Sequence, residues 1–143
     1  MKKTFKILAA MLRIAIIALF VTIGFSMAAC KNDSDDPNQP KQFLKVEGIP
    51  KTYKNMYGII LLTPPNSSDI TIYSALEKIN DTSISFPLYI WEDDDPWEGS
   101  GSFCVKILIF KNAESEDRVY QGVTTKTKIT DNTVIKWSSF TEK

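Results

Sequence analysis

The stretch Gly101–Lys111, GSFCVKILIFK, predicts a long central β-strand and decides the fold class. Successive side chains of a strand point to opposite faces of the sheet. One face of this strand carries only apolar side chains, those of Phe103, Val105, Ile107 and Ile109. The other face carries Cys104, Lys106, Leu108 and Phe110. Because both faces are mostly apolar, we expect the first in the core and Leu108 and Phe110 partly covered by a loop or a neighbouring sheet.

Six other short runs combine β-branched and aromatic residues with turn formers at their ends, which is typical of strands. They cover residues 43–48, 56–63, 70–73, 83–91, 119–128 and 133–140. Only Ser74–Ile79 looks helical, and so short a helix is marginal. Without longer helices between the strands, a parallel sheet is disfavoured. The pattern predicts an all-β fold, either a single antiparallel β-sandwich or a partly open barrel of about seven strands.

The same pattern predicts the core and one irregular position. Pro87 has no backbone N–H, so it places the run at residues 83–91 at a sheet edge or a bulge. The expected core consists of apolar side chains on alternating positions, namely Val46, Ile60, Leu62, Phe103, Val105, Ile107, Ile109, Ile135 and Trp137.

The N-terminus has the pattern of an export signal. Residues 1–13 hold four cationic side chains and no acidic one, and the apolar run IAIIALFVTIGF follows at residues 14–25. A membrane-spanning helix needs ~20 predominantly apolar residues. The 16 uncharged residues between Arg13 and Cys30 are slightly too few. We therefore interpret residues 1–29 as a helical signal peptide.

The segment Met27-Ala28-Ala29-Cys30 resembles the bacterial lipobox, with Met27 where leucine is more common. The resemblance implies cleavage before Cys30, a thioether bond from the Cys30 thiol to diacylglycerol, and acylation of the new N-terminus, commonly with palmitate. Each buried CH₂ contributes ~0.8 kcal/mol to membrane binding, so two or three acyl chains would form a stable anchor. This covalent lipid is the only prosthetic group that we expect, and the membrane lipid is the partner of the anchor.

A polar segment separates Cys30 from the first predicted strand. Residues 31–42 contain three Asp, two Pro, two Asn and two Gln and no apolar side chain, so they cannot bury themselves. A flexible chain of this length reaches roughly 20 Å. The predicted organisation is thus a signal peptide at residues 1–29, a lipidated cysteine and disordered tether at residues 30–41, and a β domain at residues 42–143.

Composition excludes several classes of function. The chain of 143 residues has no histidine, which removes every Ser-His and Cys-His nucleophile pair. Its two cysteines cannot form a Cys-only zinc site. Residues 1–29 hold four of the 17 cationic side chains and none of the 17 acidic ones, so the remainder carries a net charge of about −4. That charge disfavours nucleic acid as a partner.

The most unusual stretch is Trp91–Ser102, WEDDDPWEGSGS, with five carboxylates within seven residues. Oxygen-rich loops can hold Ca²⁺, but the register of the calcium-binding loop motif is absent. Consecutive acids on one loop also do not face each other across a sugar, as glycoside hydrolysis requires. We interpret the stretch as a mobile, solvated loop without a metal. The candidate binding residues are Tyr89, Trp91, Asp93, Asp94, Asp95 and Trp97.

Two further features each allow two interpretations. Five tyrosines, Tyr53, Tyr57, Tyr73, Tyr89 and Tyr120, together with Trp91 and Trp97, could form either an exposed recognition surface or ordinary packing. Cys104 has no cysteine partner once Cys30 is lipidated. Its position indicates a small buried hydrophobe, with a reactive or intermolecular thiol as the alternative.

Three segments in order resemble the small outer-surface lipoproteins of spirochaetes of the treponemal type: GIPKTYKNMYGIILLT, DPWEGSGSFCVKILIFKNAESEDRVYQG and KTKITDNTVIKWSSF. The resemblance implies a lipid-anchored β domain in the bacterial envelope, in the outer membrane or at the cell surface, and it supplies no reaction. We expect a non-catalytic binding module for a host protein, an envelope protein or a glycan. The alternatives are a structural or assembly subunit of the envelope and a histidine-free hydrolase.

Overall fold

The computed structural model of the chain describes residues 37–114 and 116–143. The predicted signal peptide, Cys30 and the tether as far as Asp36 lie outside the described residues. Among the described residues, no helix has the length and apolar character needed to span a bilayer. Residues 37–143 form one compact unit, which contains the predicted β domain.

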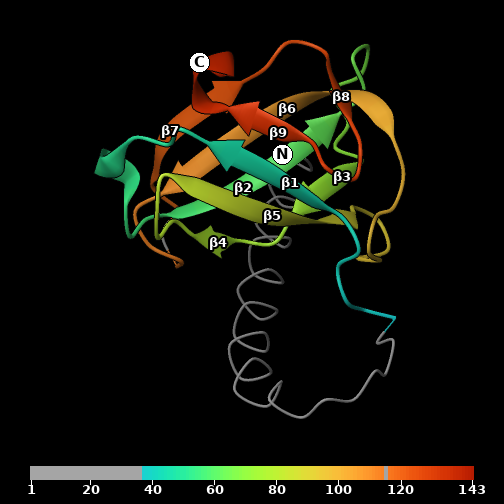
Figure 1. The fold of residues 1–143 in the computed structure, drawn as a ribbon, viewed down its shortest axis with the longest axis horizontal. Helices are drawn as coiled ribbons and strands as arrows, with labels where there is room; N and C mark the ends of the chain where they lie inside the picture. The colour runs from blue at the N-terminus through green and yellow to red at the C-terminus, as the bar shows by residue number, and fades with distance from the viewer. Residues whose placement is uncertain (1–36, 115) are drawn as a thin grey trace. The chain divides into compact units, whose positions relative to one another are not determined.

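Apart from two 3₁₀ turns, the regular secondary structure of the described residues consists of β-strands, as the sequence predicted (Figure 1). The first half contains β1 (Phe43–Glu47), a 3₁₀ turn η1 (Lys51–Tyr53), β2 (Tyr57–Thr63), β3 (Ile72–Ser74), β4 (Glu77–Lys78) and β5 (Ser83–Ile90). The second half contains β6 (Gly101–Phe110), β7 (Arg118–Val123), β8 (Thr127–Ile129), β9 (Val134–Lys136), the 3₁₀ turn η2 (Trp137–Ser139) and β10 (Thr141–Glu142).

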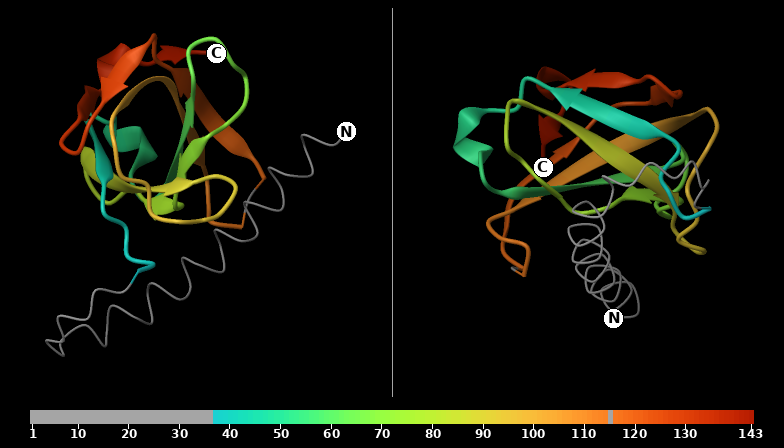
Figure 2. Two further views of the ribbon diagram at one scale, coloured as in Figure 1. Left: turned by 90° about the vertical axis from the view of Figure 1, so that its right-hand side faces the viewer. Right: turned by 60° about the horizontal axis from the view of Figure 1, so that its bottom comes forward.

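All of these strands belong to one curled, open sheet that resembles a half-barrel (Figure 2, left). Its order is β10-β7-β6-β2-β3-β5-β1-β9, with β4 on β2 and β8 on β6. Of the two predicted architectures, the partly open barrel agrees with this single curled sheet, and the β-sandwich is wrong. The reason is that β3 and β5 continue the sheet from β2 to β1, so the strands do not divide into two packed layers.

The two edges of the sheet are consecutive in the chain. β9 pairs with β1 at one edge and β10 pairs with β7 at the other, and only η2 separates β9 from β10. The pairing of β1 with β9 is parallel, whereas the other strand pairs are antiparallel. The run at residues 133–140, predicted as one strand, is thus a short strand and a turn that connects the edges.

The core lies on the concave face of the half-barrel. Of the expected core residues, Val46, Ile60, Leu62, Val105, Ile107, Ile109 and Ile135 are buried, whereas Phe103 and Trp137 are partly buried and pack against the others. The core face predicted for β6 is confirmed, because Val105, Ile107 and Ile109 all belong to the core cluster. In the pairing with β2, Ile107 lies opposite Ile60 and Val105 lies opposite Leu62, which are core residues too. On the other face, Leu108 and Phe110 are also buried, as expected.

The short helix predicted at residues 74–79 is wrong. Ser74 ends β3 and residues 77–78 form β4, both paired with β2. The Ser74 Oγ accepts a hydrogen bond from the Ile60 N–H at 2.8 Å, which occupies the backbone donor at the break between the two strands. Pairing with β2 and burial of Ile79 in the core stabilise the extended conformation of this segment, whereas an isolated helix of six residues is only marginally stable.

β5 is an interior strand between β1 and β3, but its pairing with β3 covers only Leu88–Ile90, so Pro87 lies at a local edge and not in a β-bulge. The Leu88 N–H donates to the carbonyl of Gln42 on the β1 side. Neighbouring N–H groups of a strand point to opposite sides, so position 87 faces β3. β3 has ended at Ser74, opposite Leu88, and no ladder bond is lost there.

Candidate functional site

The acidic stretch folds back on β5 as a tight hairpin. The Ile90 N–H donates to the Asp95 carbonyl at 2.8 Å, and the Asp94 N–H donates to the Ile90 carbonyl at 3.0 Å. Asp94 has a φ of 57°, a left-handed conformation that aspartate tolerates better than most residues. On the β3 side, the Trp91 N–H donates to the Thr71 carbonyl at 3.0 Å. The loop is therefore anchored to the sheet on both sides, whereas the sequence suggested a mobile connection.

Trp97 belongs to the packing of the half-barrel. Its backbone N–H donates to the Leu88 carbonyl at 2.9 Å, and its ring meets Phe103 edge to face at 5.9 Å between centroids. The side chain is partly buried and packs against the core. Of the three candidate aromatic residues, all of them partly buried, Trp97 is the one that packs against this core.

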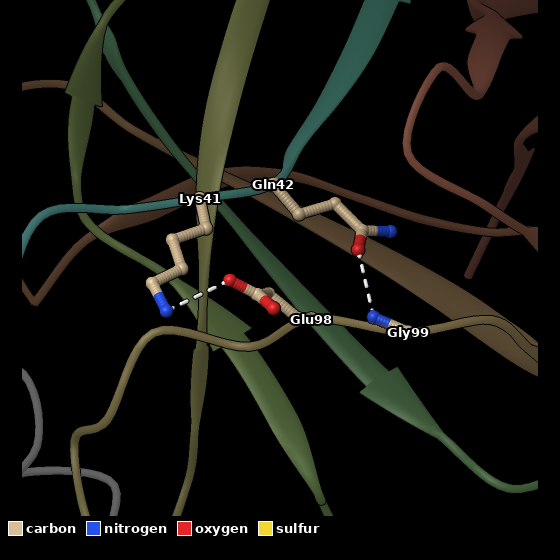
Figure 3. Close-up of polar contacts among 4 residues, drawn as sticks. All are labelled: Lys41, Gln42, Glu98 and Gly99. Carbon is tan, nitrogen blue, oxygen red and sulfur yellow. Dashed lines mark hydrogen bonds and ion pairs between the residues drawn. The ribbon is translucent and has the colours of Figure 1, made fainter.

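The end of the loop is fastened to the start of β1 (Figure 3). The Gly99 N–H donates to Gln42 Oε1 at 3.0 Å, and Lys41 Nζ lies 2.9 Å from Glu98 Oε1. Gln42 is only 3% exposed, and its Nε2 is buried without a hydrogen-bond partner. The Lys41–Glu98 pair is exposed and contributes at most about 1 kcal/mol. The bond to Gln42, which lies in the interior, is the more constraining of the two.

The hairpin and β3 together form an aromatic patch of Tyr73, Tyr89 and Trp91. Tyr73 lies opposite Tyr89 in the β3–β5 pairing, with ring centroids 5.9 Å apart. Trp91 meets Tyr73 edge to face at 5.4 Å. Tyr73 is 4% exposed, and its hydroxyl donates to Asp94 Oδ1 at 2.6 Å. Tyr73 is thus the buried member of the patch, and Tyr89 and Trp91, which are partly buried, are its more accessible members.

The carboxylates of the hairpin surround this patch without forming a metal site. Asp94 is held by Tyr73, whereas Glu92, Asp93 and Asp95 are exposed. Within the described part of the chain, no three acidic or cysteine side chains are arranged to hold a metal ion. In the same part, the side chains of Glu92, Asp93 and Asp95 form no hydrogen bond or ion pair.

Glu77 is a further acidic group beside the patch that the sequence did not single out. Burial raises the pKa of the half-buried Glu77 carboxyl above its ordinary value. The pKa of Tyr89 is also raised, first by burial and second by the negative charge of Glu77. The second effect means that the negative charge of Glu77 opposes ionisation of Tyr89.

Replacing Glu77 with glutamine is expected to stabilise the fold at neutral pH, by less than about 1 kcal/mol. The raised pKa means that the folded state binds the proton more tightly than the unfolded state, so ionised Glu77 opposes folding. The gain should be present above the folded-state pKa and should vanish as the pH falls below the unfolded-state value. Urea unfolding of both proteins across that pH range measures it, and a gain that grows in acid would contradict this account.

A second aromatic cluster surrounds Trp137, the first residue of η2. Trp137 contacts Tyr120, Tyr53 and Phe140, with centroid distances of 4.7, 5.4 and 5.9 Å. Burial and the charge of Glu142 raise the pKa values of Tyr53 and Tyr120. Rings this close to one another leave no space for a ligand between them, so this cluster is packing around η2. Cys104 is free and partly exposed.

Comparison with protein-family models, with curated proteins and with solved structures gave no match for this chain.

Proposed function

We propose that this protein is a lipid-anchored binding module of a bacterial envelope, in the outer membrane or at the cell surface, without catalytic activity of its own. The anchor would be the diacylglycerol on Cys30, in keeping with the lipobox-like residues 27–30 and the resemblance to spirochaete surface lipoproteins. The partner would be a host protein, an envelope protein or a glycan.

The observation that carries this proposal is the fixed presentation of Tyr89 and Trp91. Both rings are partly exposed and contact the ring of Tyr73, and backbone hydrogen bonds tie the hairpin to the sheet. Amphipathic aromatic side chains are favoured at protein interfaces. A rigid loop loses little conformational entropy when it binds, so more of the contact energy appears as affinity.

The residues of the patch favour binding over catalysis. Its polar groups are carboxylates and two tyrosine hydroxyls, and the chain has no histidine. The Asp94 carboxylate accepts the hydrogen bond of Tyr73, a residue that is itself buried, so the pair serves to support the loop.

Capture of partners by the immobilised full chain tests the proposal, using purified matrix proteins, envelope proteins and glycans. We expect a partner that is retained by the wild type and lost, by at least about tenfold in affinity, with Trp91→Ala. The matched control is Val134→Ala, which truncates an exposed apolar side chain on β9. Equal capture by the wild type, Trp91→Ala and Val134→Ala would show that the aromatic patch is not the binding site. Turnover of an ester, peptide or glycoside substrate would reject a non-catalytic function.

A further inference from the structure

The charged side chains of the hairpin that carries Trp91 are all acidic. Glu92, Asp93 and Asp95 on the hairpin are exposed, and Glu77 on β4 is half-buried beside Tyr89. The described part of the chain offers none of these four carboxylates an ion-pair or hydrogen-bond partner. Ionised groups that lose water need a partner of opposite charge. The local field therefore attracts cations to this surface.

Lys78, the neighbour of Glu77 on β4, is exposed and forms no ion pair within the described part of the chain, and two other cationic side chains are engaged or remote. Lys41 forms its ion pair with Glu98 at the base of the hairpin. Lys106 on β6 lies opposite Leu61 of β2, and β3 separates β2 from the strand that carries Tyr89. These carboxylates are solvated by water in the free protein, and a basic group of a second molecule would pair with them.

The aromatic rings add a preference for the kind of cation. Trp and Tyr faces attract guanidinium and ammonium groups, by ~0.5–1 kcal/mol at exposed sites and more when water is excluded. Trp91 and Tyr89 are partly exposed and lie beside the unpaired carboxylates, so one side chain could contact a ring and a carboxylate together. Arginine suits such a site best, because its planar group stacks on rings and donates two parallel hydrogen bonds to a carboxylate.

We propose that the aromatic patch and its surrounding carboxylates bind a basic, arginine-containing segment of a partner protein. This inference rests on the proposed binding function and names the chemical class of the partner. A neutral glycan would leave the negative charge at the patch uncompensated, and an anionic polymer or lipid headgroup would be repelled by it.

Isothermal titration of the full chain in a non-ionic detergent with a synthetic peptide of alternating arginine and serine tests the inference. The matched peptide has glutamine in place of arginine. We expect the arginine peptide to bind and the glutamine peptide to bind at least about tenfold more weakly. The affinity should fall as salt is raised, because exposed charges are screened.

Two variants locate the binding, and one control separates local contact from net charge. Asp93→Asn with Asp95→Asn, and Trp91→Ala separately, are each expected to weaken binding about threefold to tenfold. The control, Glu114→Gln with Asp131→Asn, removes the same charge from exposed positions in the β6–β7 and β8–β9 loops, and its effect should stay below about twofold.

Several outcomes would overturn the inference. These are equal binding of the two peptides, no binding of the arginine peptide, or equal weakening by the control and by the hairpin variants. Failure of the proposed function looks different. A neutral protein or glycan that is captured through Trp91 would leave the binding function standing and reject the basic partner, whereas capture independent of Trp91 would reject both.

Discussion

Replacement of Cys30 with serine is expected to abolish incorporation of a radiolabelled fatty acid and to release the protein from the membrane fraction. The lipobox-like residues 27–30 predict a single lipid attachment point on this thiol, and a hydroxyl cannot take its place. Two or three acyl chains provide the whole of the expected membrane affinity, so the effect should be complete and not partial. Growth of expressing cells with labelled palmitate, followed by gel analysis and fractionation, measures both consequences.

The chain provides its own control for this experiment in Cys104. This second cysteine is free and lies on β6 within the folded domain. Cys104→Ser should keep the full label, which would show that the loss in Cys30→Ser reflects the anchor and not a general effect of removing a thiol. Equal labelling of Cys30→Ser and the wild type would reject the anchor.

Truncation of Ile107 to alanine is expected to cost ~2–5 kcal/mol of folding stability. Ile107 is fully buried at the centre of β6, opposite Ile60 on β2 and Gly122 on β7. Its removal would leave a cavity between two neighbouring strands that are held in register by their own ladders, so the site could collapse only in part. Urea unfolding monitored by tryptophan fluorescence gives the difference in free energy.

Val119→Ala is the matched control for Ile107, because it also shortens a β-branched residue on a strand. Val119 is 43% exposed on β7, and its truncation should change the stability by less than about 0.5 kcal/mol. A loss for Ile107→Ala as small as that of the control would mean that the concave face of β6 is not the core.

The strands were predictable because each is specified locally. Alternation along β6 identified Val105, Ile107 and Ile109 as core residues, and turn formers marked the ends of most strands. The arrangement of the strands was not predictable, because it depends on pairing between distant segments. The local sequence of β9 does not indicate that this strand pairs with β1 in parallel. The local sequence of β3 likewise does not indicate that it lies between β2 and β5. The same non-local pairing makes Ser74–Ile79 extended chain where a helix was expected.

The candidate site was predictable in part. Tyr89, Trp91 and the acidic residues were recognised by composition, and the structure brings Tyr89 and Trp91 together with Tyr73. The direction of a ring beyond the end of a strand depends on the path of the hairpin, so composition alone could not show that Trp97 packs against the core and that Trp91 contacts Tyr73. Gln42 could have been found, since alternation places it on the same face as Leu44 and Val46.

The pairing of β1 with β9 sets the order of events when the chain folds. It joins the first strand of the domain to one of the last, so the sheet lacks one edge until Val134–Lys136 has been synthesised. Contacts between segments far apart in the sequence slow folding, because loop closure must precede them. A chain that completes its sheet only at the end would stay unfolded for longer during synthesis.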